Sequence, residues 1–174
     1  MFRLFIFLFS FKVAFGQFVE SANKFNLSIP VPNGWTIEQQ SIFHKPGENE
    51  KLFVQLVKQK QDTSKSYLKV VITYNEEQDV ICDFGTLLKI DTVNVSGFKA
   101  KRSFAENCGW HLSCSAPPGT VMPIVAYSLD YLIKVNEKKF LKINSEYFSR
   151  DENQREQFKD EIIYFVNTIK IKSP

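Results

Sequence analysis

The sequence predicts an α+β fold in which antiparallel strands carry one amphipathic helix, packed on the sheet, near the C-terminus. Two observations lead to this prediction. From Phe25 to Tyr147 the chain is a series of short stretches in which apolar and polar residues alternate, a period of two that is typical of half-buried strands. From Ser149 to Lys170 the apolar residues instead recur every three or four positions, which is typical of a helix with one apolar face.

The first sixteen residues have the pattern of a secretory signal peptide. Arg3 precedes an apolar block, Leu4–Phe11, and the small residues Ala14 and Gly16 stand where a signal peptidase needs them. The block is much shorter than the roughly 20 residues that span a bilayer. A short buried strand or helix at the true N-terminus is the alternative, but the block has no polar face to suit a half-exposed element.

We therefore expect residues 1–16 to be removed and residues 17–174 to form a single domain. The mature protein is expected to be secreted or periplasmic, with no stable membrane insertion after the signal is removed. The formal net charge of +3, less the two positive charges of Arg3 and Lys12, leaves +1 for the mature chain. No basic run is longer than Lys99–Arg102, so the sequence does not predict a nucleic-acid partner.

The first half of the mature chain predicts four strands. The first alternates from Phe25 to Val31 and ends at the turn Pro32-Asn33-Gly34, after which Trp35 is expected to pack on the core. The other three are expected in the stretches WTIEQQSIFHKPGENE, where a turn at Lys45-Pro46-Gly47 follows a short polar strand, KLFVQLVKQ and SYLKVVITYNEEQ. The last of these also fits a helical spacing, but its valine, isoleucine and threonine residues favour a strand.

Two antiparallel hairpins are predicted in the second half. In the first, alternating stretches flank a turn at Val95-Ser96-Gly97. In the second, the alternation of Val125–Ile133 is followed by a turn at Asn136-Glu137-Lys138 and a returning strand through Phe140–Tyr147.

The C-terminal helix is predicted from both its apolar stripe and its start. Ser149 and Glu152 have the S-x-x-E spacing of a capping box. In this motif each of the two side chains accepts a hydrogen bond from the backbone N–H of the other residue. The stripe consists of Phe158, Ile162, Phe165, Val166 and Ile169. The remaining IKIKSP is expected to be a short edge strand or a tail.

The stretch ENCGWHLSCSAPPG is the one candidate for special chemistry. Because disulfides form in oxidising compartments, we expect Cys108 and Cys114 to pair and to close a short loop, with Trp110 and His111 as candidate interaction residues. Free or differently paired thiols remain an alternative. A zinc site would need a fourth ligand, and C-x-x-H-x-x-C is not a usual zinc spacing, so no metal is expected. Cys82 is expected to be buried, although pairing with either other cysteine stays open.

The sequence predicts no catalytic residue and no cofactor. The two histidines, His44 and His111, lie in turn-like stretches, and neither a G-x-S-x-G nor an H-E-x-x-H motif is present. Acidic residues gather at positions 76–83, where paired carboxylates could in principle act as acid and base or bind calcium. The spacing of a calcium loop is absent, and we interpret this stretch as a solvated turn.

Three segments of the chain resemble the PsbP-like (Mog/PsbP) fold, a family that includes photosystem II extrinsic subunits and exported bacterial proteins of the DcrB type. They are the opening strand that ends in P-N-G-W, the hairpin YLIKVNEKKFLKI, and the helix that runs into FVNTIKIK. The resemblance implies an antiparallel sheet flanked by helices and a binding or assembly role outside the cytoplasm. It implies no catalytic residue, and the stretch 62–119, which includes the cysteine loop, has no counterpart in it.

The leading hypothesis is therefore an exported, non-enzymatic binding or accessory protein that docks to another protein. One specific form is an immunity-type protein that neutralises a toxin. A small-ligand carrier, which would need a concave pocket, is the first alternative. A hydrolase that uses carboxylates or His111 is the second.

Overall fold

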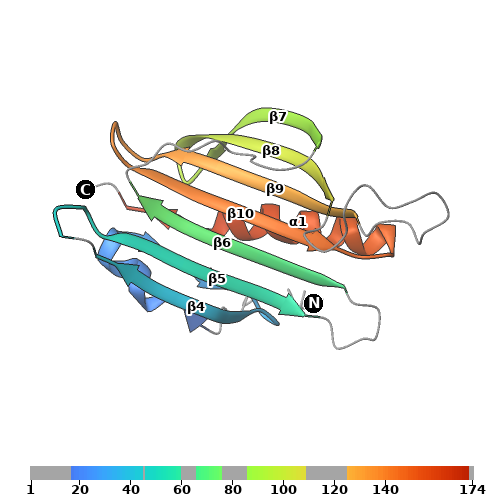
Figure 1. The fold of residues 1–174 in the computed structure, drawn as a ribbon, viewed down its shortest axis with the longest axis horizontal. Coiled ribbons are helices and arrows are strands. Elements are labelled where there is room, and N and C mark those ends of the chain that lie inside the picture. Colours follow the sequence, from blue (N-terminus) through green and yellow to red (C-terminus); the bar gives the residue numbers. More distant parts are fainter. Residues whose placement is uncertain (1–16, 45, 60–65, 76–85, 109–124, 173–174) are drawn as a thin grey trace, which may run out of the picture.

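Seven strands of the computed structural model form one antiparallel sheet, in the order β4-β5-β6-β10-β9-β8-β7 (Figure 1). The structure describes residues 17–44, 46–59, 66–75, 86–108 and 125–172. The strands are β4 (Thr36–Phe43), β5 (Lys51–Gln59), β6 (Tyr67–Asn75), β7 (Thr86–Val95), β8 (Phe98–Cys108), β9 (Val125–Lys134) and β10 (Phe140–Phe148).

Short elements and one α-helix complete the described part of the chain. They are β1 (Gln17–Phe18), the 3-10 helix η1 (Glu20–Phe25), β2 (Leu27–Ser28), β3 (Pro30–Val31), α1 (Glu152–Thr168) and β11 (Lys170–Ile171). β1 pairs with β3, and β11 pairs with β2, so both ends of the described chain pair with the segment 27–31. Among the described residues, no helix is both long and apolar enough to cross a bilayer.

The prediction of an α+β fold with helices flanking the sheet is wrong. The protein is mostly β, with a single α-helix in the described ranges. The physical reason is that the period-two alternation extends over most of the chain before the C-terminal stretch. The other segment that fits a helical spacing, in SYLKVVITYNEEQ, forms the strand β6, as its β-branched residues favour. The helix does pack on the sheet as predicted, and both hairpins form where their turns were expected.

Of the predicted strands, the first differs most from the observed structure. Residues 20–25 form the 3-10 helix η1, and only the short strands β2 and β3 follow. Asn26 ends η1 with a φ of 58°, in the left-handed region that asparagine tolerates better than most residues. This reversal turns the segment back over the sheet, so its apolar residues still reach the core.

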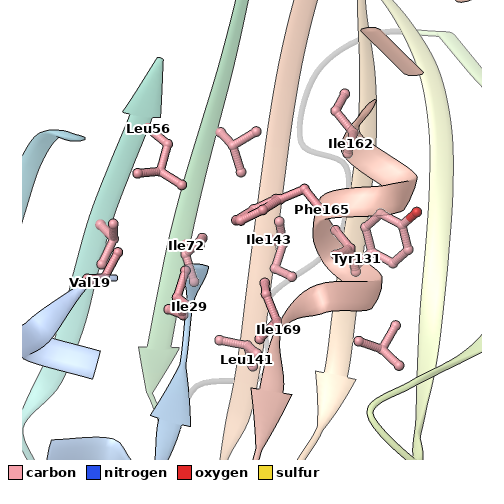
Figure 2. Packing of buried hydrophobic residues seen from close by; sticks show 14 of the residues in the cluster. Val19, Ile29, Leu56, Ile72, Tyr131, Leu141, Ile143, Ile162, Phe165 and Ile169 are labelled. Carbon is pink, nitrogen blue, oxygen red and sulfur yellow. The ribbon is translucent and has the colours of Figure 1, made fainter. Parts of the chain in front are cut away.

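The core lies on one side of the sheet, which we call the helix face because α1 covers it. Alternate residues of the central strands point to this side and are fully buried, as the pleat of a strand requires. α1 contributes its predicted stripe, and Figure 2 shows Phe165 and Ile162 pointing from the helix toward Ile143 and Tyr131. The N-terminal segment covers the rest of this face with Val19 and Ile29, while Trp35 packs on Phe165 with ring centroids 5.2 Å apart.

The start of α1 corrects the predicted capping box. The N-cap residue is Asp151, whose carboxylate accepts a hydrogen bond from the Asn153 backbone N–H at 3.0 Å. Ser149 is instead buried, and its hydroxyl is 2.7 Å from the side-chain oxygen of Gln154 and 3.1 Å from the hydroxyl of Ser66. Because these contacts occupy the Ser149 side chain, the helix begins two residues later than a Ser149 cap would place it.

The turn between β7 and β8 fixes the register of these two strands. Ser96 and Gly97 have φ angles of 51° and 85°, as in the two-residue turns that match the twist of a hairpin. The Ser96 hydroxyl also accepts a hydrogen bond from the Ile171 backbone N–H at 3.0 Å. The hairpin is thereby attached to the C-terminal strand.

Candidate functional site

Strand β7 forms one edge of the sheet and is unusually apolar for an edge. Within the described ranges no strand pairs with its outer side, so its backbone groups there are open to another chain (Figure 1). Leu87, Leu88 and Ile90 are 46%, 49% and 57% exposed. Soluble proteins usually protect an edge with a short strand, prolines or several charges, but β7 is ten residues long and contains no proline.

The opposite edge, β4, differs in composition. Its middle carries the exposed polar residues Glu38, Gln39 and Gln40, beside an irregularity in its pairing with β5. Phe43, which is exposed near the end of β4, packs edge-on against Phe53. The exposed aliphatic side chains are therefore concentrated at the β7 edge.

The pairing with β8 determines which way each β7 side chain points. Lys89 lies opposite Phe104 and Asp91 opposite Arg102, which places these residues on the helix face. Ile90 lies on the other side, which we call the outer face. Leu87 shares that outer face, and Leu88 is the extra residue where the register shifts between positions 87 and 89.

A groove of about 190 Å³ lies on the helix face between the β7–β8 hairpin and α1. Its lining residues are Lys89, Asp91, Arg102, Phe104, Leu129, Lys159 and Ile163. Three of them are apolar and four are charged. The volume is below the roughly 300–1,000 Å³ of typical small-molecule sites, so it is better suited to a few side chains than to a whole ligand.

One ion pair holds the β-sheet wall of this groove. The Arg102 guanidinium donates two hydrogen bonds to the Asp91 carboxylate, from Nε at 2.8 Å and from Nη2 at 2.6 Å. This contact lowers the pKa of Asp91 to about 2, so the carboxylate stays ionised and neutralised by its partner. Lys89 is 3.3 Å from the same carboxylate, but its side chain is 67% exposed.

Three aromatic rings of β8, β9 and β10 lie under the cations of α1 next to the groove. Phe104 stacks on Tyr127 at 5.9 Å, and Tyr127 stacks on Tyr147 at the same distance. Two cations of α1 lie over these rings: Lys159 Nζ is 5.6 Å from the Phe104 centroid, and Arg155 Cζ is 5.6 Å from that of Tyr127. These contacts keep a positive charge of α1 close to the groove.

Side chains interrupt the ladder between β9 and β10 at the centre of the sheet. The Ser145 hydroxyl accepts a hydrogen bond from the Leu129 N–H at 3.2 Å and donates one to the Leu129 carbonyl. The Asp130 carboxylate accepts from the Ser145 N–H at 2.9 Å. Backbone groups that the regular ladder would pair are thus satisfied by a serine and an aspartate.

Among the carboxyl groups of the described residues, Asp130 has the largest pKa shift. Burial raises its pKa to about 7, although the hydrogen bond from Ser145 opposes the shift. The hydroxyls of Ser103 and Ser128 on the same face are also buried and have no well-formed hydrogen bond. Because the Asp130 carboxylate accepts a backbone hydrogen bond between β9 and β10, we assign it a structural role.

A second hollow, of about 380 Å³, lies on the other side of α1. It is lined by Pro32, Asn33, Trp35, Lys58, Asp160, Glu161 and Tyr164. The Lys58 ammonium is already paired with the Glu161 carboxylate at 2.7 Å, and the Trp35 ring is buried against the core. Its charged and aromatic groups are therefore largely occupied within the chain.

The predicted cysteine loop is not part of the described structure. Trp110, His111 and Cys114 lie outside the described residues, as does Cys82, and Cys108 is described only as the last backbone position of β8. The disulfide and the interaction loop therefore stay predictions. Across the described ranges, no group of three or more His, Cys, Asp or Glu residues is placed to hold a metal ion.

The other candidates from the sequence contribute little to this site. His44 is exposed just after β4, far along the sheet order from β7, and the acidic stretch 76–83 is outside the described residues. The β7 edge itself was missed. The stretch was predicted as a strand, but no pattern in it indicates which strand of a sheet is left without a neighbour.

Comparison with known proteins gives structural similarity but no sequence match. No family model and no curated protein sequence matches the chain, so the PsbP-like resemblance is unconfirmed. Among solved structures the chain is similar to LpqN of Mycobacterium tuberculosis, which is described as involved in cell envelope biogenesis. The TM-score is 0.50 with 9% identity, over 84% of this chain and 83% of LpqN. At this identity the similarity concerns the fold alone.

Proposed function

We propose that this protein is an exported, non-enzymatic binding protein that docks an extended segment of another protein along the free edge of β7. An added strand would satisfy the open backbone groups of the edge, and pockets for alternate side chains would provide specificity. The observation that carries the proposal is the row of half-exposed aliphatic residues Leu87, Leu88 and Ile90 on this edge.

Export is supported by the signal-peptide pattern of residues 1–16. The similarity in fold to LpqN, which is described as involved in cell envelope biogenesis, is compatible with export. The PsbP-like resemblance is compatible with the same kind of accessory role. A small-ligand carrier has less support, because one hollow is small and, in the other, Lys58 and Glu161 are already paired with each other.

The intact mass of the protein, purified from its native host, tests export. We expect a chain that begins at Gln17 and gains the mass of two hydrogen atoms on reduction, because Cys108 and Cys114 pair in an oxidising compartment. A product that begins at Met1, with three free thiols, would contradict export and the disulfide together.

Site-specific photo-crosslinking tests docking at the edge. A photoreactive residue at position 90 is expected to capture a partner in the native exported fraction, whereas one at position 36, on the opposite edge, is not. The captured protein is identified, purified and titrated. Ile90→Lys should then weaken binding by about tenfold or more, because a charge replaces a buried apolar contact.

Thr92→Lys is the matched control, since Thr92 is exposed on the same strand and face two positions away. It adds the same charge and should change the affinity by less than about threefold. Equal capture of a partner from positions 90 and 36 would contradict the proposal. So would a dimer in sedimentation velocity that Ile90→Lys dissociates, because the occupant would then be a second copy of this chain.

A further inference from the structure

We infer that the segment docked on β7 is a strand of alternating acidic and apolar residues, with its acidic side chains facing the groove beside Lys89. This inference rests on the proposed function and adds the chemistry of the partner. It follows from the different character of the two sides of β7.

The geometry of an added strand determines what its side chains meet. Successive side chains of a strand point to opposite faces, and those opposite each other on neighbouring strands lie about 5 Å apart. On the outer face, the partner would contact Leu87 and Ile90. On the helix face, it would contact Lys89 and the mouth of the groove. One side of the partner strand is therefore apolar, and the other meets charge.

The available charge at the groove mouth is positive. Asp91 is already neutralised by two hydrogen bonds from Arg102, so it presents little unpaired negative charge to a partner. Lys89 projects from the edge strand itself and is 67% exposed. It is thus the first charged group that an added strand would reach.

Lys159 adds to this charge from the helix side. Its ammonium lies over the ring of Phe104, which lines the groove, and it pairs with the Glu156 carboxylate at 2.8 Å. Counting Lys89, Arg102 and Lys159 against Asp91 and Glu156 leaves one positive charge in excess. A lysine or arginine of the partner at this place would be repelled by Lys89 and Lys159, whereas a glutamate or aspartate could reach both.

Two nine-residue peptides test the inference on the mature chain. In the first, valine alternates with glutamate; in the second, lysine replaces each glutamate. Both are capped at their ends and labelled, and binding is measured by fluorescence anisotropy at low salt. We expect the glutamate peptide to bind at least about tenfold more tightly than the lysine peptide, with an affinity that falls as salt is added.

Charge reversal on the protein provides the control. Lys89→Glu should reduce the preference for the glutamate peptide to about twofold or less, because it removes the exposed cation at the groove mouth. Lys101→Glu changes the net charge equally, but Lys101 is exposed on the outer face of β8, so this variant should keep the preference. Loss of the preference in both variants would show a nonspecific charge effect and overturn the inference.

The outcomes separate this inference from the proposed function. If both peptides bind equally and Ile90→Lys weakens both, the edge docks a strand but the inferred acidic chemistry is wrong. If neither peptide binds, edge docking itself fails, and the inference fails with it. Tight binding of the glutamate peptide, lost in Lys89→Glu and in Ile90→Lys, supports both.

Discussion

Replacing Asp130 with asparagine should remove most of the decrease in stability that we expect for this protein between about pH 4 and pH 7. Burial raises the pKa of the Asp130 carboxyl from 3.8 to about 7 in the folded state. The folded protein therefore holds a proton that the unfolded chain has already released. The resulting stabilisation is fully present below the unfolded pKa and is lost as the pH rises through about 7, a change of about 4 kcal/mol.

Urea unfolding at several pH values between 4 and 8 measures this effect. Asparagine cannot ionise, yet its side-chain oxygen can still accept the hydrogen bond from the Ser145 N–H. The variant should thus become more stable than the unmodified protein as the pH approaches and passes about 7. Asp160→Asn, at an exposed position of α1, is the control and should leave the pH profile unchanged. Parallel profiles for the protein and Asp130→Asn would contradict the prediction.

Phe165→Ala should destabilise the protein by about 4 kcal/mol. The Phe165 side chain is fully buried between α1 and the sheet (Figure 2). Its ring packs against that of Trp35. Its removal leaves a cavity that the close-packed strands cannot fill, so both the transfer free energy and the ring contact are lost.

The neighbouring residue provides the comparison for this substitution. Tyr164 is 53% exposed, so Tyr164→Ala should cost less than about 1 kcal/mol. The free energy of unfolding in urea distinguishes the two variants. Equal losses at positions 164 and 165 would mean that α1 is not held by the face described here.

Much of the secondary structure could be predicted because it depends on local patterns. The alternation around Ile143 and the apolar stripe that includes Phe165 each reflect burial of one side of an element. The start of α1 could not be predicted, because Ser149 is drawn into a buried contact with Ser66, 83 residues earlier in the chain. Only the folded chain brings these two residues together.

The fold class was predicted wrongly and the candidate site was missed, in both cases because local sequence patterns do not determine how the elements are arranged. The expectation of several flanking helices came from the family resemblance, and the second stretch that fits a helical spacing, in SYLKVVITYNEEQ, forms the strand β6. The pairing of Asp91 with Arg102 follows from the turn at Ser96-Gly97, so this part of the groove is local. The exposure of Ile90 is different, because it depends on β7 being last in the strand order, and that order is set by contacts over the whole chain.

The closure of the chain by β11 bears on when folding can finish during synthesis. Ile171 pairs with Leu27 and donates its N–H to Ser96, so these contacts cannot form until residue 171 has left the ribosome. Until then β2 has no partner strand, although β1 can already pair with β3. Attachment of the N-terminal segment and of the β7–β8 hairpin to the C-terminal strand is therefore a late step of folding.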